Sequence, residues 1–408
     1  MSKIKILAIP SDSYGVGKFR ILDPYKFIGD NHSDEIHVDI TFNAQDNDEF
    51  FKNYDVVVFH SFIHQLPHEV NVKRVNWLKS QGIKVIMDID DLWFVDQRHP
   101  MFHQVRELKI GEKKVELLKL VDYVTTTTPI FADTIKLKLG LSNTVIFPNA
   151  VNEDEEQFQS KKIESDKIRF GWLGGSSHLS DIELLTNGIS SLHYSHKGEV
   201  QFVLCGFDTR GTVSEINRET GQTNKRPINP METVWYKYEQ IFTDNYKVVD
   251  EDYKSYLHAF IETDYPDMDK PYRRRWTKDV SKYANNYNNF DVSLAPLVES
   301  TFNTNKSQLK VIEAGFHKKA IICSDVKPYT LDLTSAITEG KFNDKGNSLL
   351  VSPLKNHKQW TQHMNKLMTN PNMIEDLGNR LYETVKDTYS LKKVCKDRVE
   401  FFKSIINK

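Results

Sequence analysis

Three charged side chains close to one predicted helix carry the clearest chemistry in the sequence. Lys306, Lys310 and Glu313 recur at i, i+4 and i+7 and would therefore share one stripe of a helix. Lys306 lies at the start of this helix, predicted over 308–316, where free N–H groups and the helix dipole favour an anion. Glu313 lies about 10 Å further along the axis. The pattern suits a diphosphate joined to a ribose; the alternative is a solvated face with a Lys310–Glu313 pair.

Two apolar runs flank this helix and indicate which elements position it. Residues 291–296 form a short run that ends in a proline, and residues 320–323 form a second run. Short apolar runs are typical of parallel strands that are covered on both faces. Strand, helix and strand together predict a βαβ unit, in which ligands bind at strand carboxyl ends and helix N-termini.

The same segment resembles a known family. The pattern F-N-x-x-K-S-x-x-K-x-x-E-A-G, followed by an apolar strand and S-D-x-x-P-Y, is similar to the donor-binding segment of family 4 glycosyltransferases of the GT-B fold. The resemblance implies a nucleoside diphosphate sugar as donor, a catalytic role for Lys306 and a ribose contact for Glu313. It also implies donor contacts from the neighbouring residues Asn305, Ser307 and Lys310.

The chain departs from the family pattern at one position. Family members usually carry a second glutamate where this chain has Asn305. Either Asn305 serves as a neutral hydrogen-bonding partner, or Glu299 from the preceding loop takes the place of the missing carboxylate. A catalytic role for the family's first glutamate therefore does not carry over to this chain.

A glycine-rich turn opens the second half of the chain. The sequence IRFGWLGGSSHLSD predicts a strand over 168–173 and then a loop that contains Gly174, Gly175 and Ser176. Such a loop either makes a tight structural turn or cradles a phosphate with its backbone N–H groups. The family resemblance favours the donor site, with His178 hydrogen-bonded to a phosphate; the alternative is a structural histidine.

A second glycine-rich loop, SYGVGKFRI, follows the first predicted strand. The family resemblance implies that this loop, with Gly15 and Gly17, borders the donor and the acceptor. Arg20 could pair with a donor phosphate, because a guanidinium binds phosphate oxygens in a bidentate manner. The alternative is an arginine that caps local carbonyl groups.

Two histidines follow the apolar run DVVVF. The resemblance implies that His60, at the end of this strand, contacts a sugar hydroxyl and belongs to the catalytic residues. His64 stands at i+4 from His60, a spacing that a metal pair could also use. No H-E-x-x-H signature accompanies the pair, so we predict no metal site here.

An acidic motif, DIDD, ends the next predicted strand. A D-x-D pattern is similar to the metal-binding motif of GT-A transferases, where it chelates Mn²⁺ or Mg²⁺ on the donor diphosphate. Here the motif lies outside the predicted donor site. We therefore expect Asp90 and Asp91 to line the acceptor side; the alternative for one of them is a loop or helix cap.

The segments predict an α/β protein of the GT-B class, with two Rossmann-like domains whose parallel sheets face a central cleft. Residues 1–152 would form the N-terminal, acceptor-side domain, completed by the C-terminal helix 391–408. A charge-dense stretch, 153–167, is the predicted linker. Residues 168–390 would form the nucleotide-sugar-binding domain, with an inserted hairpin or lid within 208–275.

Composition limits the classes of function. The chain has 408 residues and a net charge of −2, so no overall field draws it to nucleic acid. The Arg273–Arg275 run is the one local exception, either as a solvated turn or as an anion clamp. Three cysteines are too few for a disulfide framework, and no apolar run approaches the ~18 residues of a membrane span. We expect a cytoplasmic protein; a basic helix at 391–406 lying on a membrane surface is the alternative.

These features predict a hexosyl-type glycosyltransferase without a metal or other cofactor. The family resemblance implies retention of the anomeric configuration. The acceptor stays open between a glycan, a protein and a lipid, and the oligomeric state is open as well. The alternatives are a transferase that modifies DNA bases, a sugar-nucleotide epimerase of the same fold, and a non-catalytic sugar-binding protein.

Overall fold

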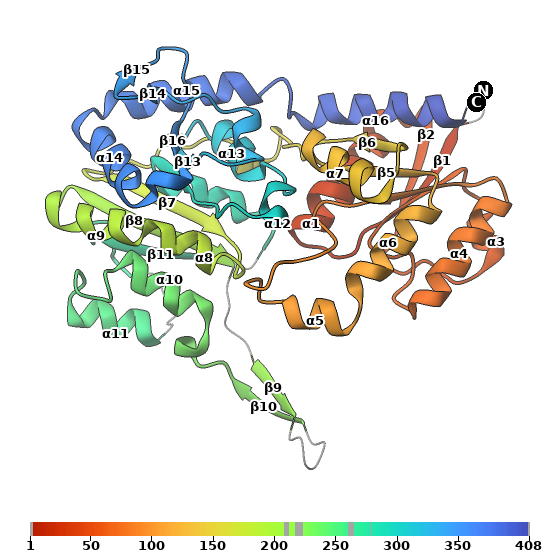
Figure 1. Cartoon of the computed structure of the whole chain (residues 1–408), viewed down its shortest axis with the longest axis horizontal. Helices are drawn as coiled ribbons and strands as arrows, with labels where there is room; N and C mark the ends of the chain where they lie inside the picture. The colour runs from red at the N-terminus through yellow and green to blue at the C-terminus, as the bar shows by residue number, and fades with distance from the viewer. Residues whose placement is uncertain (1–2, 208–211, 217–222, 260–264, 278, 407–408) are drawn as a thin grey trace.

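Two parallel six-stranded sheets organise the molecule. The computed structural model describes residues 3–207, 212–216, 223–259, 265–277 and 279–406. Each sheet is covered by helices on both faces, and the two sheets lie side by side along the long axis (Figure 1). The predicted α/β class with two Rossmann-like domains is therefore confirmed.

The N-terminal sheet has the order β2-β1-β3-β4-β5-β6, with every neighbouring pair parallel. Its strands are short and apolar, as the sequence indicated: β1 Ile4–Ile9, β2 Ile36–Ile40, β3 Val56–His60, β4 Lys84–Asp88, β5 Tyr123–Thr126 and β6 Thr144–Ile146. The connecting helical segments are α1 Gly15–Gly17, the π-helix η1 Lys18–Leu22, α2 Asp23–Asn31, α3 Asp48–Phe51, α4 His68–Ser80, α5 Phe102–Glu107, α6 Ile110–Leu120 and α7 Pro129–Leu139.

The C-terminal sheet has the order β11-β8-β7-β12-β13-β16, again all parallel. Its strands are β7 Ile168–Gly174, β8 Val200–Phe207, β11 Tyr272–Thr277, β12 Val292–Ala295, β13 Ala320–Ser324 and β16 Leu349–Val351. The main helices around it are α8 Leu179–Ile182, α9 Thr186–Ser195, α10 Val234–Phe242, α11 Glu251–Ala259, α12 Thr301–Thr304, α13 Leu309–Phe316, α14 Asn356–Thr369 and α15 Asn372–Val385.

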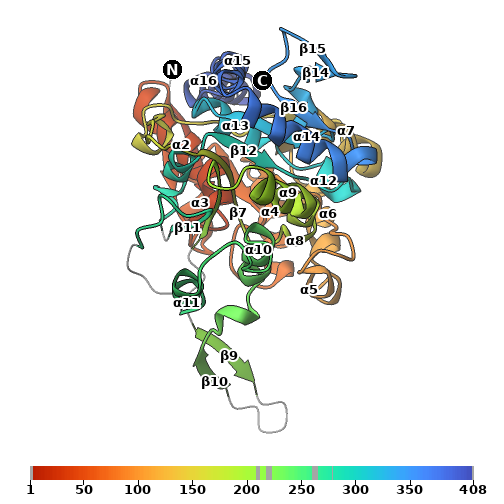
Figure 2. The same cartoon turned by 90° about the vertical axis from the view of Figure 1, so that its left-hand side faces the viewer.

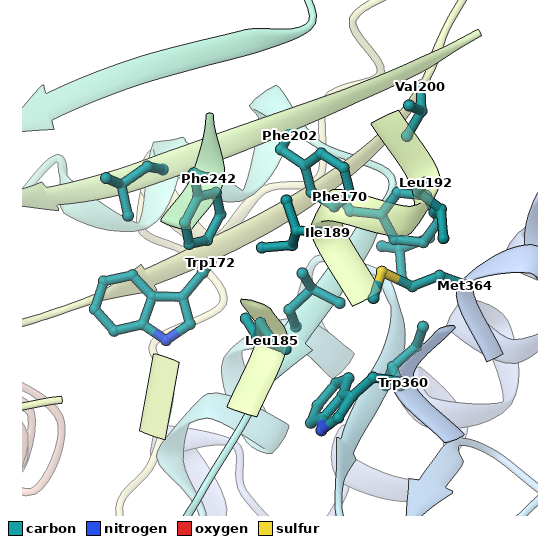
Figure 3. Close-up of a cluster of buried hydrophobic side chains, with 14 of the residues drawn as sticks. Phe170, Trp172, Leu185, Ile189, Leu192, Val200, Phe202, Phe242, Trp360 and Met364 are labelled. Atoms are coloured by element: carbon teal, nitrogen blue, oxygen red, sulfur yellow. The ribbon is translucent and has the colours of Figure 1, made fainter. Parts of the chain in front are cut away.

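Large apolar side chains fill the space between the C-terminal sheet and its helices. Figure 3 shows Trp172 of β7 and Phe202 of β8 directed towards Ile189 of α9 and Trp360 of α14. All four are essentially inaccessible to solvent. Burial of such side chains stabilises by about 1.5–3 kcal/mol each, so this layer holds the strand ends of the sheet in fixed positions.

The chain crosses between the two domains at two adjacent points. Val151 pairs with Ser390 in an isolated parallel bridge, and the Leu391 N–H donates to the Val151 carbonyl at 2.8 Å. From there α16, Leu391–Ile406, runs back along the N-terminal domain (Figure 1). Val394 and Phe402 of α16 pack into the apolar cluster that contains Ile6 of β1.

An antiparallel hairpin extends from the C-terminal domain within the predicted insertion. Its strands are β9 Thr212–Ile216 and β10 Thr223–Pro227, and Figures 1 and 2 both show it standing away from the two sheets. The turn expected around 221–224 lies partly outside the described residues. Throughout the part of the chain that the structure describes, every helix is too short or too polar to cross a membrane.

The arginine run at 273–275 is a correction to the sequence-based prediction. It is part of β11, a strand of the C-terminal sheet, and is neither a solvated turn nor an anion clamp. Arg273 and Arg275 both contact the carboxylate of Asp267, and Arg274 lies 3.1 Å from a carboxylate oxygen of Glu239. Because the two carboxylates engage all three guanidinium groups, the run is held in the fold.

Candidate active site between the two sheets

Two lysines lie at the carboxyl edge of the C-terminal sheet. Lys310 is in the first turn of α13, and Lys306 lies in the turn between α12 and α13. The Lys310 ammonium donates to the carbonyl of Leu173 and lies 4.8 Å from the centre of the Trp172 ring. Burial, together with the charge of Lys306, lowers the pKa of Lys310 to about 8. Neither lysine forms a contact ion pair with a described residue, although Asp91 attracts Lys306 and Asp181 attracts Lys310 over a longer distance.

The glycine-rich turn after β7 lets Lys310 reach this position. A Cβ added at Gly174 would lie 2.6 Å from the Trp172 ring and 2.8 Å from the Lys310 ammonium. A side chain at this position would therefore displace the lysine. Gly175 borders open space, and Ser176 is exposed, so the backbone of this loop is accessible to a ligand.

His178 follows this loop and is held by the C-terminal domain. Its Nδ1 lies 2.7 Å from Asp181, and its backbone N–H donates to the Tyr238 hydroxyl. Burial lowers the pKa of His178 to about 4, and the two lysines add to the effect, so the ring is neutral. Because a carboxylate only accepts, Nδ1 carries the proton and Nε2 is an acceptor. A donor contact by His178 stays a prediction, and in this tautomer Nε2 would accept a hydrogen bond from a hydroxyl.

His60 and the DIDD motif form the facing part of the N-terminal domain. The Nε2 of His60 lies 3.0 Å from Asp90, and its Nδ1 lies 2.7 Å from the Ser11 hydroxyl. Asp90 accepts from Nε2 and so orients the ring, while Nδ1 contacts the oxygen of a Ser11 hydroxyl that donates its proton to Asp12 at 2.7 Å. Burial and the charge of Asp90 raise the pKa of Asp91 to about 6.

The two domains meet around Lys306. The Asn149 amide, which follows β6, donates to the Ser307 hydroxyl at 2.9 Å. The rings of His99 and Phe302 are 5.2 Å apart, and Phe302 is buried in the core of the N-terminal domain. The Lys306 ammonium lies 5.0 Å from the centre of the Phe302 ring and is attracted by Asp91. Lys306 therefore faces the acidic motif across the domain junction, a proximity that involves residues far apart in sequence.

Arg20 is the clearest correction among the predicted site residues. Its side chain is fully buried, and its guanidinium binds both carboxylate oxygens of Asp88 at 2.8 Å. It also donates to the Phe147 carbonyl and to Asn149. Arg20 is therefore unavailable to a donor phosphate and instead joins the ends of β4 and β6 from inside the domain.

The glycines of the first loop differ in their surroundings. A Cβ added at Gly17 would lie 1.7 Å from the Asp12 carbonyl oxygen, so the fold itself requires glycine there. A Cβ at Gly15 would meet no atom within 4 Å, which leaves that position open. A donor contact stays a prediction for both glycines, and it is sterically accessible only at Gly15.

Lys306, Lys310 and Glu313 do not share one helical stripe, contrary to the prediction. The helix begins at Leu309, after Lys306, and Glu313 is directed into the fold with 4 % exposure. The Tyr287 hydroxyl donates to Oε2 of Glu313, whereas Oε1 has no partner among the described residues. Asn305 is buried too, and its Nδ2 donates to the Thr301 carbonyl at 2.7 Å. Ribose binding by Glu313 stays a prediction, with Oε1 as the atom that could accept from a hydroxyl.

Glu313→Gln is expected to weaken nucleotide binding and to stabilise the fold at neutral pH. Because burial favours the protonated carboxyl, the variant should lose about 0.5–1.5 kcal/mol of binding, the usual net value of a neutral hydrogen bond, measured by titration calorimetry. Burial raises the pKa of Glu313 well above its ordinary value of 4.5, so the carboxylate opposes folding as pH rises above that value. Thermal unfolding at pH 5 and pH 8 should therefore show a gain for the variant that grows with pH. A Glu375→Gln variant in α15 is the control, and equal nucleotide affinity in all three proteins would contradict the prediction.

Metal ligation finds no support in the described residues. No group of three or more His, Cys, Asp or Glu side chains within them is arranged to hold a metal ion. His64 does not pair with His60, because its Nδ1 lies 3.0 Å from the Ala44 carbonyl. The first aspartate of the DIDD motif, Asp88, is engaged by Arg20 inside the domain.

Comparison with solved structures finds 242 similar chains. A complex of S. aureus TarM with fondaparinux, alpha-GlcNAc-glycerol and UDP is 12 % identical over 85 % of this chain and 55 % of TarM, with a TM-score of 0.52. The catalytic domain of Starch Synthase IV from Arabidopsis thaliana, bound to ADP and acarbose, is 10 % identical over 100 % of both chains, with a TM-score of 0.58. An alpha-glucosyltransferase in complex with UDP-glucose and abasic DNA is 11 % identical over 100 % of this chain and 99 % of that one, with a TM-score of 0.58.

These proteins resemble the chain in structure and not in sequence. No protein-family model matches the sequence. No curated protein matches it either. The chain spans about half the length of the TarM chains that it matches, at 54 % and 55 % of them. Full-length agreement with two other solved structures, together with two parallel six-stranded sheets, shows that the chain has the GT-B fold.

Proposed function

We propose that the chain is a glycosyltransferase that moves a hexosyl group from a nucleoside diphosphate sugar to an acceptor hydroxyl. The observation that carries the proposal is the pair Lys306 and Lys310, whose charges repel each other and which form no contact ion pair with a described carboxylate. The pair lies beside the open backbone of Gly175, at the carboxyl edge of a parallel sheet, where α/β proteins bind nucleotides. A diphosphate supplies the charge and the acceptor oxygens that such a site lacks.

The reaction follows from this arrangement. The acceptor oxygen forms a bond to the anomeric carbon, and the bond between that carbon and the diphosphate oxygen breaks. The electron pair leaves with the diphosphate, and the hydroxyl proton passes to a diphosphate oxygen. Lys306 and Lys310 stabilise the charge that develops on the departing group, which is the place where electrostatic stabilisation acts most strongly on the rate.

Neighbouring groups would orient the sugar. The Nε2 of His178 is unprotonated in the neutral ring and would accept a hydrogen bond from a hydroxyl group of the sugar. On the facing domain, Asp90 holds His60 so that Nδ1 can exchange its Ser11 partner for a substrate hydroxyl. Family resemblance supports retention of configuration. The cationic site supports a mechanism without a metal, because lysines take over the neutralising role.

The arginine run was the only sequence feature that supported DNA as the acceptor. The arginine run at 273–275 is paired with Asp267 and Glu239 inside the C-terminal domain, so it offers no cation clamp to a phosphate backbone. A sugar or aglycone hydroxyl is therefore the acceptor that we propose.

A donor panel tests the proposal directly. We expect the protein, incubated with UDP-, GDP- and ADP-sugars in the presence of EDTA, to release free nucleotide slowly from one of them. Luminescent detection of UDP, GDP and ADP measures the release, and a heat-treated sample is the control. Interconversion of sugars without nucleotide release would instead identify an epimerase, and release only after addition of Mn²⁺ or Mg²⁺ would contradict the metal-independent mechanism.

A further inference from the structure

A cavity of about 590 Å³ lies in the N-terminal domain, between the loop that follows β3 and helix α6. Its walls are mostly apolar, with Phe62, Leu66 and Pro67 on the loop and Ile110 and Leu117 on α6. Cavities of roughly 300–1,000 Å³ with apolar walls and a few polar groups are typical of small-molecule sites. Neither the lysine pair nor the glycine-rich turn after β7 contributes to it.

The loop wall of this cavity is rigidly built. Oδ1 of Asn71, a buried residue of α4, accepts from the backbone N–H groups of Ile63 and His64 at 2.9 Å. Its Nδ2 donates to the carbonyls of His64 and Leu66. One side chain thus satisfies four backbone groups of an irregular loop. The cavity is therefore preorganised, which lowers the entropic cost of binding a ligand.

The outer end of the cavity is apolar and accessible. Leu66 is 49 % exposed, two residues after the buried His64. Other large apolar side chains are exposed at the same edge of the sheet: Tyr14 after β1, Phe42 after β2, and Phe94 after β4. Several exposed apolar side chains at one edge indicate a binding surface, whereas single exposed apolar side chains are common on any protein.

The inner end is polar and adjoins the proposed reaction centre. Ser61, which lines the cavity, directly follows His60. Lys114, on the opposite wall, is attracted by both Asp90 and Asp91. Asp91 in turn is attracted by Lys306 across the domain junction. Asp90 and Asp91 do not line the cavity themselves, but Ser61 and Lys114 connect its wall to the acidic motif that faces the donor lysines.

We infer that this cavity is the acceptor subsite and that the acceptor is a glycoside with an apolar aglycone. The hydroxyl-bearing head group would lie at the polar end beside Asp90 and Asp91, and the aglycone would lie between Leu66 and Ile110. The inference rests on the proposed function. The acceptor oxygen replaces the diphosphate oxygen at the anomeric carbon, the electron pair leaves on the diphosphate, and the hydroxyl proton goes with it.

Binding and transfer of n-octyl β-D-glucoside, below its micelle concentration, test the inference separately. Titration calorimetry without donor should show binding of the octyl glucoside and none of methyl β-D-glucoside at equal concentration. With the donor found in the panel, kcat/KM for octyl glucoside should exceed that for methyl glucoside by at least about tenfold, because apolar burial grows with each methylene. Leu66→Ser and Ile110→Ser, on opposite walls, should each reduce this preference by roughly 5- to 10-fold.

The matched control is Leu137→Ser, which removes an 84 % exposed leucine of α7 and should leave the preference unchanged. Equal use of the two glucosides, or equal effects of Leu66→Ser and Leu137→Ser, would overturn the inference while donor hydrolysis still supported the proposed function. Binding of octyl glucoside without hydrolysis of any donor would reject the acceptor role together with the proposed function. Binding of the protein to anionic vesicles but not to the monomeric glucoside would assign the apolar edge to a membrane surface and overturn the inference as well.

Discussion

Lys306→Ala is expected to lower kcat by about 10²–10³-fold, the loss typical of removing one electrostatic donor from a developing oxyanion. The side chain projects from the turn before α13, and its charge is opposed by no described ion pair. The leaving diphosphate is more negative in the transition state than in the ground state. Removal of the Lys306 charge should therefore reduce kcat more than it raises KM for the donor.

A matched variant separates this effect from a general loss of charge. Lys345→Ala removes an exposed lysine in the same domain, and its kinetics should match those of the wild type. Steady-state release of nucleotide across donor concentrations measures both constants. Wild-type kcat together with wild-type nucleotide affinity in Lys306→Ala would remove the diphosphate from this turn, and with it the central argument for a transferase.

The lysine pair differs from an ordinary basic surface in two respects. Lys310 is held against Trp172 and the Leu173 carbonyl, so the position of its ammonium is determined by the sheet rather than by solvent. Lys306 lies where α12 inserts Phe302 into the other domain. Any relative motion of the domains would move Lys306 with respect to Asp91. The distance between the Lys306 ammonium and Asp91 therefore depends on how the two domains are placed.

The sequence predicted the elements that local pattern determines. Short apolar runs such as 291–296 and 320–323 indicated parallel strands, and the structure has them as β12 and β13. The turn at Gly174 was also predictable, because it joins a strand to a helix in a short glycine-rich stretch. In these cases the burial of a strand on both faces, or the freedom of glycine, is already visible in neighbouring residues.

Side-chain direction and long-range pairing were not predictable in the same way. Arg20 looked like a free cation, because Asp88, its partner, lies 68 positions away. Glu313 was expected to share a ligand-binding stripe with Lys306, but α13 begins only at Leu309, and the carboxylate is buried against Tyr287. Arg273 appeared exposed because a run of like charges usually is. Each error arose where a tertiary partner, absent from the local window, decides whether a charge is buried.

Arg20→Met is expected to cost about 3–5 kcal/mol of folding stability, the usual penalty for leaving one partner of a buried ion pair without the other. Burial alone would raise the pKa of Asp88, but the ion pair and hydrogen bonds with Arg20 outweigh it and hold that pKa below its ordinary value. The stabilisation is therefore present above the ordinary aspartate pKa and is lost only as pH falls through the lowered one. Urea unfolding at pH 7 measures the change, with Arg106→Met on the surface of α5 as the control.

A double variant shows whether the cost comes from the orphaned carboxylate. Arg20→Met combined with Asp88→Leu should recover much of the loss, because replacing both members of a buried pair by apolar groups is often close to neutral. Thr125, whose hydroxyl donates to Asp88 at 2.6 Å, would then lack its acceptor, so recovery should be incomplete. A stable Arg20→Met protein with lost donor affinity would instead place Arg20 in the donor site. Because the pair with Asp88 is bidentate and fully buried, we expect a destabilised protein.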